Sequence, residues 1–178
     1  PLNTVVTTAL IDSDIVAYRI AFACQNENQK IAKLRIDSYL NDIIACGVDN
    51  TYPDCFVDRW QLFLTGKKNF RYDIATTVVY KGNRVAPKPE HLPALREHMM
   101  KEWGASVSDG QEADDDVATA GTTLGNDCVM VSLVKDIDQV AGWHYNFVKK
   151  IGYYVSESEG LFNLYCQILT GDTADNIV

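Results

Sequence analysis

Residues 112–116 carry four carboxylates in five positions, just where an apolar helix-forming run begins at Val117. Like charges one helical turn apart repel each other, and the dipole at a helix N-terminus offsets only part of that repulsion. A bound cation would neutralise the cluster. Because every candidate ligand is a carboxylate oxygen, the pattern favours Mg²⁺ or Mn²⁺ over zinc or copper. An acidic, solvated helix start is the alternative interpretation.

Further carboxylates follow other apolar runs of the chain. They are Asp12 and Asp14 after residues 8–11, Asp136 and Asp138 after residues 128–133, and Asp172 and Asp175 within residues 171–176. In open α/β sheets the carboxyl ends of the strands meet at one crevice, where ligands bind. The sequence therefore predicts that these side chains converge with residues 112–116 on a single site.

The charge of the chain is unevenly distributed. The formal net charge is −8, which on average argues against non-specific binding of nucleic acid. Between Lys67 and Lys101, however, there are eight Lys or Arg residues and only three Asp or Glu. A cationic strip beside an anionic, metal-loaded pocket suits a substrate with a phosphate backbone. The alternative is that these basic residues are exposed to solvent and bind no substrate.

The composition is that of a single domain over residues 1–178, with 47% hydrophobic and 22% charged residues. No apolar stretch approaches the roughly 20 residues that span a bilayer, and the N-terminus lacks the order of a signal peptide. A soluble cytoplasmic protein with no membrane partner is expected. The five cysteines never form a C-x-x-C pattern, which predicts reduced core thiols.

Hydrophobic patterns predict strands and helices in alternation. Strands are expected at residues 4–11, 60–64, 128–133 and 153–155. Helices are expected at residues 31–47, 92–103, 112–124 and 156–171, the last opened by the capping box Ser156-Glu157-Ser158-Glu159. This alternation is typical of an α/β fold, so we expect a three-layer α/β/α sandwich with a mainly parallel sheet.

Six short motifs follow one another along the chain from Leu10 onward. They are Leu10-Ile11-Asp12-Ser13-Asp14, Phe70-Arg71, Tyr80-Lys81-Gly82-Asn83-Arg84, Glu112-Ala113-Asp114-Asp115, Lys135-Asp136-Ile137-Asp138-Gln139 and Gly171-Asp172-Thr173-Ala174-Asp175-Asn176. In this order they resemble the 5′-3′ exonuclease and flap endonuclease family, within the PIN-like nuclease fold. Residues 142–147 are most similar to bacteriophage members.

The resemblance implies a two-metal phosphodiesterase. Two Mg²⁺ or Mn²⁺ ions about 4 Å apart can share the scissile phosphate, generate hydroxide and stabilise the leaving oxygen. The carboxylates that match ligands of the first ion are Asp12, Glu112, Asp114 and Asp115, and those that match the second ion are Asp136, Asp172 and Asp175.

Basic and aromatic residues complete what the resemblance implies. Lys81 and Arg84 match residues at the base of a helical arch, here residues 85–100, where a positive charge stabilises the transition state. With Asp115 they are the candidate catalytic residues. Tyr80 is a candidate for stacking on a terminal base, or a core aromatic. Candidate contacts to the nucleic acid backbone are Lys67, Lys68 and Arg71.

Some residues match the family pattern poorly. Asp14, Asp116 and Asp138 fit solvated or structural neighbours better than ligands. Val134 stands where the family usually has a carboxylate near both metals, and Thr65 stands where many relatives have another Asp. Thr65 remains compatible with a hydrogen bond to metal-bound water.

The two ends of the chain also bear on what is expected. The chain stops at Val178, before the helix-hairpin element that grips duplex DNA in the family, so that element is expected to be absent. It begins at Pro1 without an initiator methionine, and we therefore expect a fragment or a processed product.

The leading hypothesis is a Mg²⁺-dependent 5′-nuclease that cuts DNA with a free 5′ end or flap, in the host cytoplasm if phage-encoded. RNA in a hybrid is a further substrate, and the oligomeric state is left open. The first alternative, favoured by Val134, is a weakly active or non-catalytic module that binds metal and nucleic acid. The second is a phosphatase similar to the haloacid dehalogenase superfamily, using Asp12, Asp14, Lys135 and residues 171–175.

Overall fold

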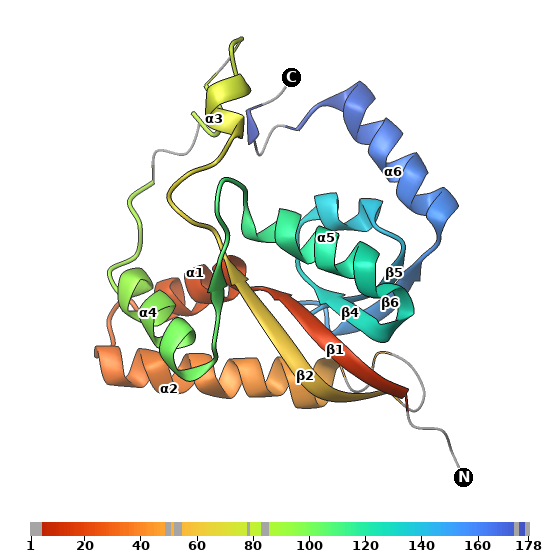
Figure 1. The fold of residues 1–178 in the computed structure, drawn as a ribbon. Coiled ribbons are helices and arrows are strands. Elements are labelled where there is room, and N and C mark those ends of the chain that lie inside the picture. The colour runs from red at the N-terminus through yellow and green to blue at the C-terminus, as the bar shows by residue number, and fades with distance from the viewer. Residues whose placement is uncertain are drawn as a thin grey trace.

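The structure, a computed structural model, describes residues 5–48, 51, 55–77, 79–82, 86–172 and 175–176. A six-stranded sheet forms its centre (Figure 1). The strands lie in the order β3 (Ser106–Val107), β2 (Cys55–Leu64), β1 (Val5–Asp12), β4 (Cys128–Val131), β5 (Gly142–Asn146) and β6 (Ile151–Val155). All neighbours are parallel except β5 and β6. The predicted, mainly parallel sheet is therefore confirmed.

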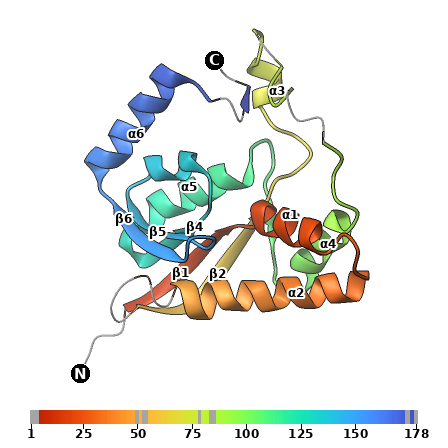
Figure 2. The same cartoon turned by 180° about the vertical axis from the view of Figure 1, so that it is seen from behind.

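Helices cover both faces of the sheet, as the views from opposite sides show (Figures 1 and 2). One face carries α1 (Ser13–Ala23), α2 (Gln29–Asn41) and α4 (Leu92–Glu102), with the π-helical turn η1 (Asp42–Gly47) continuing α2. The other carries α5 (Ala113–Leu124) and the 3₁₀ turns η3 (Gly125–Asp127) and η4 (Lys135–Gln139). Helix α6 (Glu157–Thr170) packs against η4, and most of its apolar side chains are exposed. The short helix α3 (Arg71–Ile74) follows β2.

Side-chain alternation along the central strands explains where the carboxylates point. In β1, Ala9 and Ile11 are buried in the core beneath α1, α2 and α4, whereas Leu10 is buried on the opposite face with Val117 of α5. Because successive strand residues alternate between faces, Asp12 lies on the face of Leu10. Both faces of β1 are covered, which accounts for its continuous apolar run.

The backbone of α6 lies very close to the backbone of η4 at Gly160. A Cβ atom built on Gly160 would lie 2.6 Å from the carbonyl oxygen of Gln139, so only glycine allows α6 to sit this close to η4.

The predicted capping box at the start of α6 is confirmed, since Ser156 Oγ accepts from the Glu159 N–H at 3.3 Å and Glu159 Oε2 accepts from the Ser156 N–H at 2.9 Å. This fixes the helix that carries Gln167 towards the site.

Most predicted elements are present, but the sequence patterns missed α1, α3, β3 and β5. Helix α1 follows β1 without an intervening turn, so its apolar residues merge with those of the strand. The arch predicted for residues 85–100 needs correction: from Leu92 the chain forms α4, and Leu92, Leu95 and Met99 are buried in the core. These apolar side chains are removed from water by packing on the core.

Two expectations from composition can be compared with the structure. None of the helices in the described ranges is long and apolar enough to cross a membrane. Cys24, Cys55 and Cys128 are buried free thiols and Cys166 is a half-buried one, in agreement with the predicted reduced thiols.

Candidate metal and nucleic-acid site

The candidate site lies at the carboxyl ends of β1 and β4, where the strand order reverses. Strands β2 and β4 flank β1 on opposite sides, and chains that leave a parallel sheet in opposite directions at such a point open a crevice between them. Asp12 ends β1, and Ser132 follows β4. The N-terminus of α5 and the turn η4 approach the same edge.

Asp12 is the most deeply buried carboxylate of the site, with 4% of its surface exposed. Its Oδ2 accepts a hydrogen bond from Ser132 Oγ at 3.2 Å. Burial, followed by repulsion from Asp114 and Asp14, raises the pKa of Asp12 to about 7. A buried carboxyl with raised pKa is unstable as an anion, and a nearby hard cation would restore the charged form.

The start of α5 projects three of the predicted ligands. Burial and repulsion from Glu112 and Asp115 raise the pKa of Asp114 to about 6. Asp115 differs, because the guanidinium of Arg71 donates to both of its oxygens, at 2.5 and 2.7 Å. Burial raises the pKa of Asp115, but the hydrogen bonds from Arg71 and from the Glu112 N–H outweigh it and hold that pKa below its ordinary value.

Tyr80 and Lys81 join the start of α5 to the chain's last described segment. The phenol of Tyr80 lies 3.0 Å from Glu112 Oε2 and 3.0 Å from Asp175 Oδ2. Lys81 Nζ donates to Glu112 Oε1 at 2.5 Å and lies 3.7 Å from Asp175 Oδ1. Burial and the charges of Glu112 and Asp175 raise the pKa of Tyr80. Tyr80 is 5% exposed and packs edge-on against Tyr72, so its ring offers little surface for a base.

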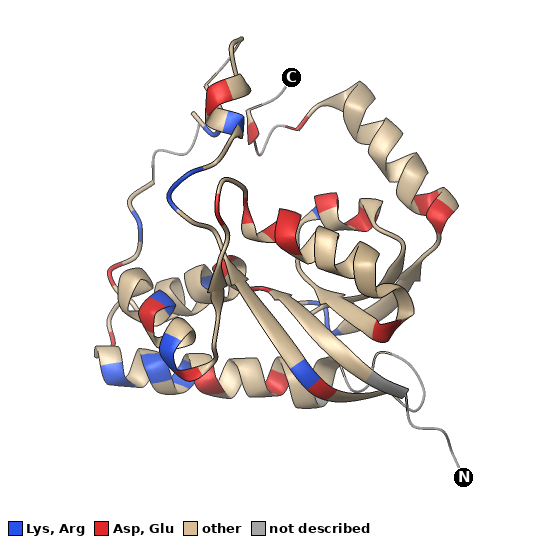
Figure 3. Cartoon of the chain, in the orientation of Figure 1, with Lys and Arg blue, Asp and Glu red and all other residues tan. Residues whose placement is uncertain are grey.

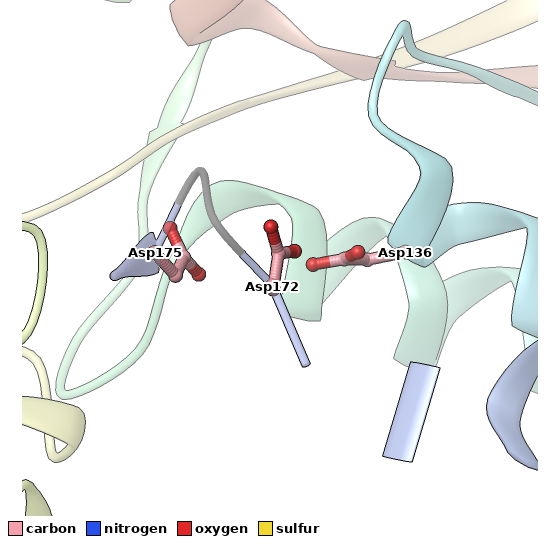
Figure 4. A group of neighbouring side chains, drawn as sticks. All are labelled: Asp136, Asp172 and Asp175. Carbon is pink, nitrogen blue, oxygen red and sulfur yellow. The ribbon is translucent and has the colours of Figure 1, made fainter. Parts of the chain in front are cut away.

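Asp136, Asp172 and Asp175 form the tightest carboxylate cluster. One oxygen of each lies within 4.8 Å of the others, and the Asp172 carboxylate lies between the other two (Figure 4). Gln167 of α6 donates to Asp136 at 2.6 Å and to Asp172 at 3.1 Å. Lys135 Nζ lies 3.5 Å from Asp172.

The donor set fits a hard divalent ion. All three ligands are carboxylates, and two oxygens bound to one Mg²⁺ lie about 3–4 Å apart, so one oxygen of each carboxylate, all within 4.8 Å of one another, could reach a single ion with small side-chain shifts. Among the residues that the structure describes, these three form the one group of three or more potential ligands gathered this tightly. The residues predicted to bind the other ion are not gathered as tightly, but they lie close enough for their charges to interact. The charge of Asp114 raises the pKa of Asp12, and the charge of Glu112 raises the pKa of Asp114.

A cavity of about 420 Å³ brings the two carboxylate groups together. Asp114 and Asp115 line one side of it, with Arg71, and the three clustered aspartates line another. Apolar side chains of α5, η4 and α6 close the rest. Figure 3 shows Lys and Arg residues along the segment after β2, across from the acidic start of α5. Of the carboxylates predicted to converge, five line this cavity: Asp114, Asp115, Asp136, Asp172 and Asp175.

Several predicted residues lie elsewhere or have other partners. Asp14 binds Arg96 and the Thr65 N–H, Asp116 accepts from Gln111, and Asp138 accepts from Tyr153 at 2.7 Å; their interpretation as neighbours of the site fits these contacts. Lys67 and Lys68 are exposed on the turn after β2. Arg71 is bound to Asp115, and its predicted contact with the nucleic-acid backbone stays a prediction. Arg84 lies outside the described residues.

Val134 points at the core. It is half-buried and packs against an apolar cluster that includes Leu10, Val117 and Ile137. Its N–H donates to Ser132 Oγ at 3.3 Å, and the same hydroxyl donates to Asp12. The segment after β4 therefore supports Asp12 through Ser132, with no carboxylate at position 134.

Sequence reasoning missed Ser132 and Gln167, which contact predicted ligands, and Arg96, which contacts Asp14. Ser132 could have been found, because it directly follows the apolar run of β4. Gln167 and Arg96 lie within ordinary amphipathic helices, and no local signal separates them from solvated polar residues.

Comparison with known proteins gives similar structures without similar sequences. No family model and no curated protein matches the chain. The T5 D15 protein co-crystallised with metal ions matches with a TM-score of 0.64 at 15% identity, over 96% of this chain and 67% of that one. The T5 5′-exonuclease with bound divalent zinc ions matches with a TM-score of 0.60 at 17% identity, over 96% and 68%.

A third similar structure contains nucleic acid. It is a pseudo-enzyme–product complex of bacteriophage T5 flap endonuclease with DNA and metal ions, with a TM-score of 0.60, 18% identity and coverage of 96% of this chain and 68% of that one. At such identities the likeness shows the fold. The chain therefore has the fold of the 5′-3′ exonucleases and flap endonucleases, as the six motifs predicted.

Proposed function

We propose that this protein is a divalent-metal-dependent 5′-nuclease that hydrolyses phosphodiester bonds of DNA with a free 5′ end or flap. The observation that carries the proposal is the single cavity of about 420 Å³ that two separate groups of carboxylates line. One group comes from the start of α5, and the other from η4 and the segment after α6. Two hard-ion sites facing one space is the arrangement that two-metal phosphoryl chemistry needs.

The residues divide into roles that follow from their contacts. Asp136, Asp172 and Asp175 would hold one ion, and Asp114 and Asp115 would contribute to a second, with Mg²⁺ or Mn²⁺ suited to this oxygen-only set. When bound, the ions supply a hydroxide nucleophile and neutralise charge on the phosphate. Lys81, beside both groups, supplies a fixed positive charge for the phosphate in the transition state.

DNA as substrate is supported by charge and by fold. The segment after β2 carries exposed Lys67 and Lys68 at the edge of the site, and phosphate contacts of this kind give sequence-independent binding. One similar structure is a complex with DNA. Binding should weaken with salt, and the product should carry a shortened or released 5′ strand.

The test compares two neighbouring aspartates. Asp136→Asn removes a charge from the clustered carboxylates, whereas Asp138→Asn changes a residue that binds Tyr153 outside the cavity. With a 5′-labelled flap duplex and Mg²⁺, we expect wild type and Asp138→Asn to cut at similar rates and Asp136→Asn to lose at least about 100-fold. Chelation by EDTA should stop all cleavage. Equal cleavage by both variants would contradict the proposed site.

A second candidate function is a metal- and DNA-binding module with little catalysis. Val134 favours it, because this side chain packs in the core where a further carboxylate was expected. Binding of Mn²⁺ and DNA without cleavage would support this candidate. A phosphatase is less compatible, since both oxygens of Asp14, the acid it would need beside Asp12, are already bound by Arg96 and Thr65.

A further inference from the structure

Thr65, at the end of β2, has all of its backbone and side-chain polar groups engaged by other elements. Its N–H donates to Asp14 Oδ2 at 2.7 Å, and its carbonyl oxygen accepts from Arg96 Nη2 at 2.5 Å. Its hydroxyl Oγ1 accepts from the Ala113 N–H at 3.0 Å. One residue thus joins α1, α4 and α5 at the edge of the sheet where the carboxylates gather.

The first two contacts hold Thr65 itself in place. The guanidinium of Arg96 reaches both Asp14 and the Thr65 carbonyl, so α4 is tied to the start of α1 and the end of β2 at once. Two hydrogen bonds from one planar guanidinium fix direction as well as distance. The side chains of Arg96 and Asp14 are 25% and 18% exposed, which limits their access to solvent.

The third contact reaches the start of α5. Ala113 is the first residue of α5, is 1% exposed, and stands between the carboxylates Glu112 and Asp114. The N–H groups in the first turn of a helix have no partner within the helix, and a buried one needs an acceptor from elsewhere. Thr65 supplies that acceptor across the sheet edge.

We propose that Thr65 is a positioning residue, held by Asp14 and Arg96, which sets the position of the α5 N-terminus and so aims Asp114, which lines the cavity, for metal binding. The proposal rests on the proposed function. A neutral hydroxyl suits this place because it accepts the Ala113 hydrogen bond without adding another negative charge to the acidic first turn of α5.

A matched pair of substitutions tests this role. Thr65→Val keeps the shape and removes the hydroxyl, whereas Thr65→Ser keeps the hydroxyl and removes the methyl group. Mn²⁺ affinity is measured without DNA, from the free-Mn²⁺ EPR signal, on variants of residues 1–178 whose circular dichroism matches wild type. We expect Thr65→Val to weaken Mn²⁺ binding about tenfold, the scale seen when supports of metal ligands are removed, and Thr65→Ser to stay within about twofold of wild type.

Amide hydrogen exchange of wild type gives a second measurement, which does not depend on whether a variant folds correctly. The Ala113 amide should be protected in metal-free protein, because it donates to Thr65. An unprotected Ala113 amide, unchanged Mn²⁺ affinity in Thr65→Val, or an equal loss in Thr65→Ser would each overturn the positioning role. Failure of wild type to bind Mn²⁺ at all would instead contradict the proposed function, and with it this inference.

Discussion

Replacing Asp12 with Asn should stabilise the metal-free protein, although the substitution removes a predicted metal ligand. The Asp12 carboxyl is 4% exposed and faces Asp114. Its ionised form is therefore poorly solvated and repelled. An asparagine has nearly the same shape, carries no charge, and its amide oxygen can still accept the hydrogen bond from Ser132 Oγ.

The size of the effect follows from the pKa of Asp12, which rises from 3.8 to about 7 on folding. The folded protein then binds the proton more tightly than the unfolded chain, so this carboxyl destabilises the fold increasingly as the pH rises from about 4 to 7. Three pH units at about 1.4 kcal/mol each set an upper limit of about 4 kcal/mol. Because real sites relax, we expect about 2–4 kcal/mol at pH 8 and almost nothing at pH 4.

Urea denaturation in EDTA at pH 4, 6 and 8 measures this effect. Wild type should lose stability across the range, and Asp12→Asn should lose less. At pH 8, Mg²⁺ should stabilise wild type more than the variant, because only wild type offers the anionic oxygen. A wild-type stability that is independent of pH, or an Asp12→Asn variant less stable than wild type at pH 8, would refute the reasoning.

Three other substitutions probe the same site. Asp115→Asn should destabilise the metal-free protein by about 1–3 kcal/mol in a urea titration, because it leaves the Arg71 charge unpaired; an unchanged midpoint would mean that the pair contributes nothing. Lys81→Ala should slow turnover at saturating DNA about 100-fold while Kd changes little, and an equal loss in both would make Lys81 a backbone contact. Val134→Asp should destabilise the metal-free protein in a urea titration, because it places a carboxylate in the apolar cluster that Val134 packs against; an unchanged midpoint would mean that this side chain does not contribute to the core.

Local patterns were enough to predict several elements and the place of the carboxylates. The runs that became β1 and β4 are apolar because both faces of these strands are covered, and each run is followed by polar side chains at the sheet edge. The capping box of α6 is a contact between residues three positions apart. Such features depend on neighbours in the chain, so the sequence itself contains the information.

The partners of those carboxylates were decided by the tertiary structure. Arg71 and Asp115 are 44 positions apart, Arg96 and Asp14 are 82 apart, and Tyr80 and Asp175 are 95 apart. The crowding of carboxylates in the sequence suggests that removing any one carboxylate charge relieves repulsion. We expect this for Asp12, whereas Asp115 differs, because packing brings the guanidinium of Arg71 to it.

The sequence by itself thus determined which side chains reach the carboxyl ends of the strands, since strand alternation and helix starts are local properties. The fate of each carboxylate depended on elements that meet only after folding. Some are paired with a positive charge, some remain repelled by other carboxylates, and Asp14 binds residues of β2 and α4 at the edge of the sheet. The reason is physical: burial and nearby charge set the energy of a carboxylate, and both arise from packing between distant segments.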